Sequence, residues 1–134
     1  MTSVAEMMQS PVLAIGVRAS LRQAAIALRD GHVGVLVVMD DGDATGVLSE
    51  RDIVRAIAGG ADPDAADVGS VRSEGPRYAT PSDSPAAALS VMLDAGIRHL
   101  PVIEEDELVG IVSMRDVARA LAYAVGDAPR PADG

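Results

Sequence analysis

The stretch Gly46–Ala58, GVLSERDIVRAIA, recurs at Gly110–Ala122 as GIVSMRDVARALA, and this repetition decides how the chain folds. Glycine, serine, aspartate, two arginines and two alanines are identical in the two copies, and every other apolar residue of the first copy is matched by an apolar residue in the second. The same offset of 64 residues also relates Leu36 to Leu100. Self-similarity at a fixed period indicates a duplicated structural unit. Any functional chemistry should therefore lie at two related places.

Each copy predicts the order β-α-β-β-α after a short helical turn. Apolar runs bounded by turn residues predict the strands, and a serine N-cap before a helical apolar stripe predicts each first helix, with Gln23 completing a capping box after Ser20. In the first copy these elements are Val4–Met8, Val12–Ile15, a helix from Ser20 to Gly31, Val33–Met39, Gly46–Ser49 and Glu50–Ala58. In the second they are Val68–Val71, Arg77–Thr80, a helix after Ser84 and Pro85, Arg98–Ile103, Leu108–Ser113 and Met114–Val125.

These elements predict an α/β (α+β) fold made of two tandem repeats. We expect the first repeat over residues 1–60, a connector over 61–67 and the second repeat over 68–125. Residues 126–134, rich in proline, aspartate and glycine, are expected to form a flexible tail.

Composition excludes several classes of function. The chain has no cysteine and two histidines, so neither disulfides nor a His/Cys metal site are expected. Its net charge of −9 disfavours binding to nucleic-acid phosphates. The start lacks a charged segment followed by a long apolar run, and no apolar stretch is long enough to span a membrane. We therefore expect a cytoplasmic protein without nucleic-acid or membrane partners.

The repeated Ser-x-x-Asp motif, Ser49 to Asp52 and Ser113 to Asp116, allows two interpretations. Each motif follows a strand and opens a helix, where serine and an acid three residues later commonly form a capping box. The same helix start also offers free N–H groups that suit a phosphate. There the carboxylate can accept both hydroxyl hydrogens of a ribose diol.

Arg51 and Arg115 stand between the serine and the aspartate of each motif. A guanidinium there can neutralise a phosphate. The alternative is a solvated surface ion pair, which is common and weak.

In combination, GVLSERD (46–52), GIVSMRD (110–116) and IRHLPVIEEDELVG (97–110) resemble the cystathionine-β-synthase (CBS) domain, whose repeats pair into a Bateman module. The resemblance covers nearly the whole chain and extends to free-standing actinobacterial CBS pairs of the hypoxic response protein type. It implies two repeats packed as a pseudo-two-fold pair.

The resemblance also implies a ligand class. Ser49 with Asp52, and Ser113 with Asp116, would line two clefts between the repeats for AMP, ATP, NAD or S-adenosylmethionine. Adenine would be held by apolar residues around Val12–Ile15 and Tyr78–Thr80.

Arg98 and His99 distinguish the second repeat, because the first has Gly34 and Val35 in their places. We interpret Arg98 and His99 as extra cations for phosphate in one cleft. The alternatives are a solvated arginine and a histidine hydrogen-bonded to the backbone. This difference predicts two unequal sites.

The prediction is a non-enzymatic sensor of adenosyl nucleotides, assembled as a homodimer, that needs no cofactor and acts on an unknown regulated protein. The first alternative is an interaction module with empty clefts. The second is a phosphate-handling enzyme, which would need a metal-binding carboxylate cluster. Asp40, Asp41 and Asp43 are the candidates for such a cluster, and a hairpin turn explains them better.

Overall fold

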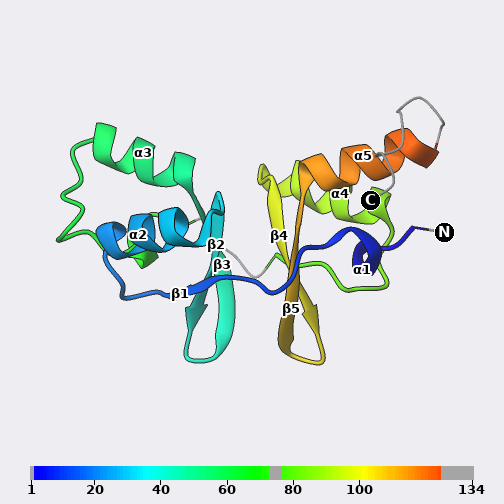
Figure 1. Cartoon of the computed structure of the whole chain (residues 1–134), viewed down its shortest axis with the longest axis horizontal. Helices are drawn as coiled ribbons and strands as arrows, with labels where there is room; N and C mark the ends of the chain where they lie inside the picture. The colour runs from blue at the N-terminus through cyan, green and yellow to red at the C-terminus, as the bar shows by residue number, and fades with distance from the viewer. Residues whose placement is uncertain (1, 73–76, 125–134) are drawn as a thin grey trace. The chain divides into compact units, whose positions relative to one another are not determined.

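The computed structural model describes residues 2–72 and 77–124, which form two compact units. Among the described residues, one unit comprises residues 11–72 and the other residues 2–10 together with 77–124. Five α-helices and two sheets make up the mixed α/β architecture of this part of the chain (Figure 1). The predicted flexible tail lies outside the described residues.

The first unit is built on a three-stranded sheet in the order β1-β2-β3. Strand β1 (Ala14–Gly16) runs parallel to β2 (Val35–Asp40), which pairs antiparallel with β3 (Asp43–Ser49). Helices α2 (Leu21–Gly31) and α3 (Glu50–Ala58) belong to the same unit. The buried residues that join sheet and helices are mostly aliphatic: Ala24, Leu28, Leu36, Val38, Leu48, Ile53 and Val68.

The second unit repeats this plan with a smaller sheet. Strand β4 (His99–Glu104) pairs antiparallel with β5 (Glu107–Ser113), and helices α4 (Pro85–Ala95) and α5 (Met114–Ala124) pack in the same unit. Both hairpins shift register at equivalent positions, between Val38 and Met39 and between Val102 and Ile103. The duplicated sequence therefore folds twice into the same hairpin and helix, as predicted.

Helix α1 (Val4–Met7), which opens the first repeat in sequence, packs in the unit of the second repeat. Figure 1 shows it in dark blue among the elements of that unit, and it contacts α5. Val4 is fully buried in the second core, and its N–H donates to the Asp83 carbonyl at 2.9 Å. Gln9 and Ile111 exchange two main-chain hydrogen bonds of 2.8 and 3.0 Å. The 64-residue counterpart of Val4, Val68 in η1 (Val68–Ser70), is buried in the first core.

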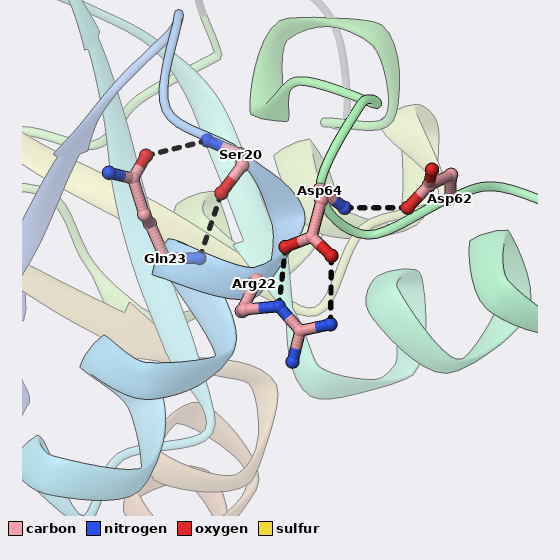
Figure 2. Close-up of polar contacts among 5 residues, drawn as sticks. All are labelled: Ser20, Arg22, Gln23, Asp62 and Asp64. Carbon is pink, nitrogen blue, oxygen red and sulfur yellow. Dashed lines mark hydrogen bonds and ion pairs between the residues drawn. The ribbon is translucent and has the colours of Figure 1, made fainter.

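The connector before Val68 is bound to the start of α2. The N–H groups of Leu21 and Arg22 donate to the carbonyls of Ala66 and Pro63 at 3.1 and 3.0 Å. Arg22 also makes two side-chain hydrogen bonds to Asp64, the second of 3.0 Å from Nη2 to Oδ2 (Figure 2). The hydrogen bond from Arg22 lowers the pKa of Asp64, although this pair is exposed and therefore worth little stability.

Most predicted helix ends are confirmed. Ser20 and Gln23 form the predicted capping box, and Ser84 caps α4 with proline in its first turn. Helix α3 spans the predicted Glu50–Ala58. Helix α2 includes Gly31, and the left-handed residue that ends it is His32, with φ of 53°.

The strand predicted at Arg77–Thr80 is wrong in extent. Only Ala79 pairs there, through a single parallel bridge to Val102. The Thr80 N–H instead donates to the Asp83 carboxylate at 2.9 Å, so it is unavailable to a strand ladder. In the first repeat the strand predicted at Val12–Ile15 is observed one to two residues later, at Ala14–Gly16.

Candidate ligand sites at the two repeated helix starts

The first Ser-x-x-Asp motif joins β3 to α3 through a complete capping box. Ser49 has extended backbone angles, and its Oγ accepts from the Asp52 N–H at 3.2 Å. In return the Ser49 N–H donates to Asp52 Oδ2 at 2.8 Å. Both residues are half-buried, so the carboxylate is held at the surface end of the strand.

The second motif repeats this geometry between β5 and α5. Ser113 Oγ accepts from the Asp116 N–H at 3.0 Å, and the Ser113 N–H donates to Asp116 Oδ2 at 3.1 Å. The capping interpretation is therefore confirmed at both places. In each box one carboxylate oxygen is used, and Oδ1 of each aspartate has no hydrogen bond to the described residues. Capping leaves that oxygen able to accept from a ligand, so the ligand interpretation stays a prediction.

Arg51 and Arg115 lie exposed in the first turns of α3 and α5. Neither forms an ion pair with any residue that the structure describes. The surface-pair alternative is therefore not observed for these side chains. The proposed contact of their guanidinium groups with phosphate remains a prediction.

The segment before β4 lies beside the second motif through its backbone. The Met114 N–H donates to the Arg98 carbonyl at 2.8 Å, and His99 is directly opposite Ser113 in the hairpin. Opposite residues of an antiparallel pair project from the same face. The first repeat has the same main-chain arrangement at Gly34 and Val35, without a cationic side chain. Arg98 is exposed, and His99 is half-buried and engaged in an interaction.

A pocket of about 560 Å³ lies between α1 and α5 in the second unit. Its size falls within the range of roughly 300–1,000 Å³ that is usual for small-molecule sites. Asp116 is one lining residue, and sequence reasoning missed the others: Thr2, Glu6, Met7, Arg119, Ala120 and Tyr123. The spacing of 116, 119, 120 and 123 does indicate one helix face. Nothing in the sequence pattern shows that α1 lies against that face.

The acidic residues of the β2–β3 hairpin form a turn, as predicted. Asp40 pairs with Asp43, while Asp41 and Gly42 have positive φ angles of 54° and 87°. Among the residues described, no three His, Cys, Asp or Glu side chains are grouped so as to hold a metal ion. Within the described residues, 2–72 and 77–124, no helix is both long enough and apolar enough to cross a membrane.

Both repeats match a known protein family. The CBS domain model matches residues 4–59 and again 68–123. The chain belongs to the CBS-domain family. Hypoxic response protein 1 of Mycobacterium tuberculosis is 36% identical over 123 residues, which cover 90% of this chain and 86% of that protein. The predicted resemblance to the hypoxic response protein type is thus confirmed.

Solved structures agree with the fold. The crystal structure of Hypoxic Response Protein I with two coordinated zinc ions has a TM-score of 0.75 and 35% identity, covering 88% of this chain and 98% of that one. The CBS domain protein PAE2072 from Pyrobaculum aerophilum, complexed with AMP, has a TM-score of 0.80 and 28% identity, covering 95% and 100%. The CBS pair of protein MJ0100, in complex with 5′-methylthioadenosine and S-adenosyl-L-methionine, has a TM-score of 0.79 and 21% identity, covering 92% and 98%.

The residues of this chain do not match the usual chemistry of a zinc site. Zinc in proteins is held mainly by cysteine and histidine, usually with four ligands in a structural site. This chain has no cysteine, and its two histidines, His32 and His99, lie in different compact units. We therefore assign no role to zinc in this chain.

Proposed function

We propose that this chain is a non-catalytic cytoplasmic sensor that binds adenosine-containing ligands at its two Ser-x-x-Asp helix starts. CBS-domain proteins are in general regulatory modules without catalytic activity. The observation that carries the proposal is the duplicated capping box, which fixes an aspartate at each helix start and leaves its Oδ1 without a hydrogen bond to the described residues. Binding of AMP by a relative of 28% identity supports the ligand class.

The mechanism follows from differential binding. A ligand that prefers one arrangement of the chain shifts the population toward that arrangement, and a regulated partner would respond to the shift. The backbone N–H groups and partial positive charge of a helix start favour an anionic group, while the aspartate favours ribose hydroxyls. No nucleophile, base or metal is needed for this task.

A melting-temperature screen with AMP, ATP, NAD and S-adenosylmethionine tests the proposal. A ligand at a hundred times its Kd stabilises the folded state by about 2.7 kcal/mol. For a chain of this length we therefore expect the Tm to rise by roughly 5 °C or more. A Tm unchanged by all four compounds at millimolar concentration would favour the alternative, an interaction module that binds no ligand.

Arg98 is expected to supply a phosphate contact in the cleft that it lines, whichever of the two Ser-x-x-Asp motifs shares that cleft. The other cleft lacks this contact, because Gly34 stands at the equivalent position of the first repeat. Arg98→Ala should weaken AMP binding by about tenfold while adenosine binding stays within about twofold, because it removes one charged contact and leaves the ribose contacts. The salt dependence of AMP binding should decrease as well. Titration calorimetry at two ionic strengths measures both effects. Equal losses for adenosine and AMP would show that Arg98 is a surface residue without a ligand role.

We further propose that the chain forms a homodimer through exposed apolar helix faces. Val54 and Ile57 on α3 are 65% and 48% exposed, and Leu93 on α4 is 64% exposed. Exposed apolar residues gathered on helices commonly mark interfaces.

Charge substitution on α3 tests this assembly. Val54→Asp is expected to shift the mass measured by light scattering from two chains to one at micromolar concentration. Ala87→Asp, which adds the same charge at an exposed position of α4, should leave the dimer intact. The mass of a single chain for the unmodified protein would exclude the dimer.

A further inference from the structure

The pocket between α1 and α5 combines groups that suit an amino acid better than a phosphate. We propose that it selects an adenosyl ligand whose 5′ substituent ends in an amino acid over one that ends in phosphate. This inference rests on the proposed function, because it takes Asp116 as the residue that holds the ribose. It adds the identity of the group beyond the ribose and the residues that recognise that group.

The residues that α5 contributes to the pocket lie along one face of the helix. Relative to Asp116, the other residues follow by three, four and seven positions: Arg119, Ala120 and Tyr123. At this spacing they share a helix face about 10 Å long. Helix α1 contacts α5 and contributes Glu6 to the same pocket. A ligand held by its ribose at Asp116 would therefore extend toward Glu6, Arg119 and Tyr123.

The pocket contains both acidic and basic side chains, which do not form ion pairs with one another. Glu6 and Arg119 are exposed, and neither forms an ion pair with any described residue. Together with Asp116 the pocket has two carboxylates and one guanidinium, an excess of one negative charge. The two carboxylates oppose the attraction of Arg119 for a phosphate chain, so the excess negative charge disfavours phosphate here relative to a group that carries both charges. Arg98 and His99, the two residues predicted to contact phosphate, are not among the lining residues.

An α-amino acid group matches this arrangement at both of its ends. Its ammonium can donate to Glu6, and its carboxylate can accept two parallel hydrogen bonds from Arg119. Met7 and the ring of Tyr123 provide apolar contact for the intervening methylene groups. An aromatic face also attracts a cation such as a sulfonium. S-adenosylmethionine and S-adenosylhomocysteine are therefore the appropriate probes.

The first repeat provides an internal control, because it has counterparts of only some of the residues that line the pocket. Asp52, Arg55 and Ala56 correspond to Asp116, Arg119 and Ala120, but Gly59 stands where the second repeat has Tyr123. Helix α3 ends at Ala58, so it has no residue at that position. The counterpart of Glu6 is Ser70, which has no charge. Selection for an amino acid is therefore expected at the second repeat alone.

Calorimetry with four probes tests the inference: S-adenosylmethionine, S-adenosylhomocysteine, 5′-methylthioadenosine and AMP. We expect both amino-acid compounds to bind the second-repeat site more tightly than 5′-methylthioadenosine, which lacks the amino acid. Glu6→Gln and Arg119→Gln should each weaken S-adenosylhomocysteine binding by about three- to tenfold. Neither should weaken 5′-methylthioadenosine binding, and Glu6→Gln should not weaken AMP binding. Arg55→Gln, the matched change in the first repeat, should leave all four affinities at this site unchanged.

The outcomes separate this inference from the proposed function. If AMP or 5′-methylthioadenosine binds as tightly as S-adenosylhomocysteine, the selection is absent and the sensor function stands. The same conclusion follows if Glu6→Gln affects S-adenosylhomocysteine and 5′-methylthioadenosine equally. If none of the four compounds binds while ATP or NAD still raises the Tm, the inference is overturned and the sensor function stands. If ATP and NAD also leave the Tm unchanged, the sensor function is overturned as well.

Discussion

Asp116→Ala is expected to weaken binding of an adenosyl ligand at the second repeat by at least tenfold. The substitution removes a charged acceptor of ribose hydroxyl groups, and hydrogen bonds to charged groups contribute about 1.5–3 kcal/mol. Asp52→Ala should have the same effect at the first repeat, whose capping box has closely similar distances. Titration calorimetry with the ligand identified in the melting screen measures each site.

The capping role of Asp116 must be separated from its ligand role, because the alanine also removes a hydrogen bond from the Ser113 N–H. Loss of a helix cap costs about 0.5–2 kcal/mol of stability. Ser113→Ala is the matched control, since it removes the other half of the box and keeps the carboxylate. We expect Ser113→Ala to lower the Tm about as much as Asp116→Ala but to weaken binding less. Equal affinity in Asp116→Ala and the unmodified protein would leave the aspartate with its capping role alone.

The local parts of the site were predictable from the sequence because their hydrogen bonds join residues three apart. A serine N-cap and an acid three residues later are enough to fix the helix starts at Ser49 and Ser113, whatever surrounds them. The hairpins were predictable for a similar reason. Each consists of two apolar runs joined by a short turn, in which Asp41 or Glu105 adopts a positive φ.

The contacts that join distant segments were not predictable in the same way. Periodicity marks Val4 as apolar but does not show which core it enters, and that core contains Met92, Val102 and Val117. Likewise, the apolar segment at Ala79 predicts a strand, but the competing hydrogen bond from Thr80 to Asp83 limits pairing to one bridge. The pocket was missed because it needs both α1 and α5, which are more than a hundred residues apart in the sequence.

Val4→Asp is expected to cause a large loss of stability. Val4 has no exposed surface and lies in the core of the second unit. An aspartate there would place a carboxylate in an aliphatic environment without a cationic partner, and an uncompensated buried charge costs about 3–5 kcal/mol. Domains are usually stable by about 5–15 kcal/mol, so much of the total is lost. Urea denaturation measures the loss, with exposed Ala5→Asp as the control next to it.

The part of the chain that loses stability shows which repeat α1 stabilises, the first repeat, which it opens in sequence, or the second repeat. Val68 is the 64-residue counterpart of Val4 and is equally buried, but in the core of the first unit. In hydrogen-exchange measurements, Val4→Asp should reduce protection most in β4, β5 and α5, and Val68→Asp should reduce it most in β2, β3 and α3. Such local losses are measurable because compact units open with their own free energies. Loss of protection in β2 and β3 caused by Val4→Asp would mean that α1 packs on the first repeat. That result would contradict the hydrogen bonds that Val4 and Gln9 make with Asp83 and Ile111 of the second repeat.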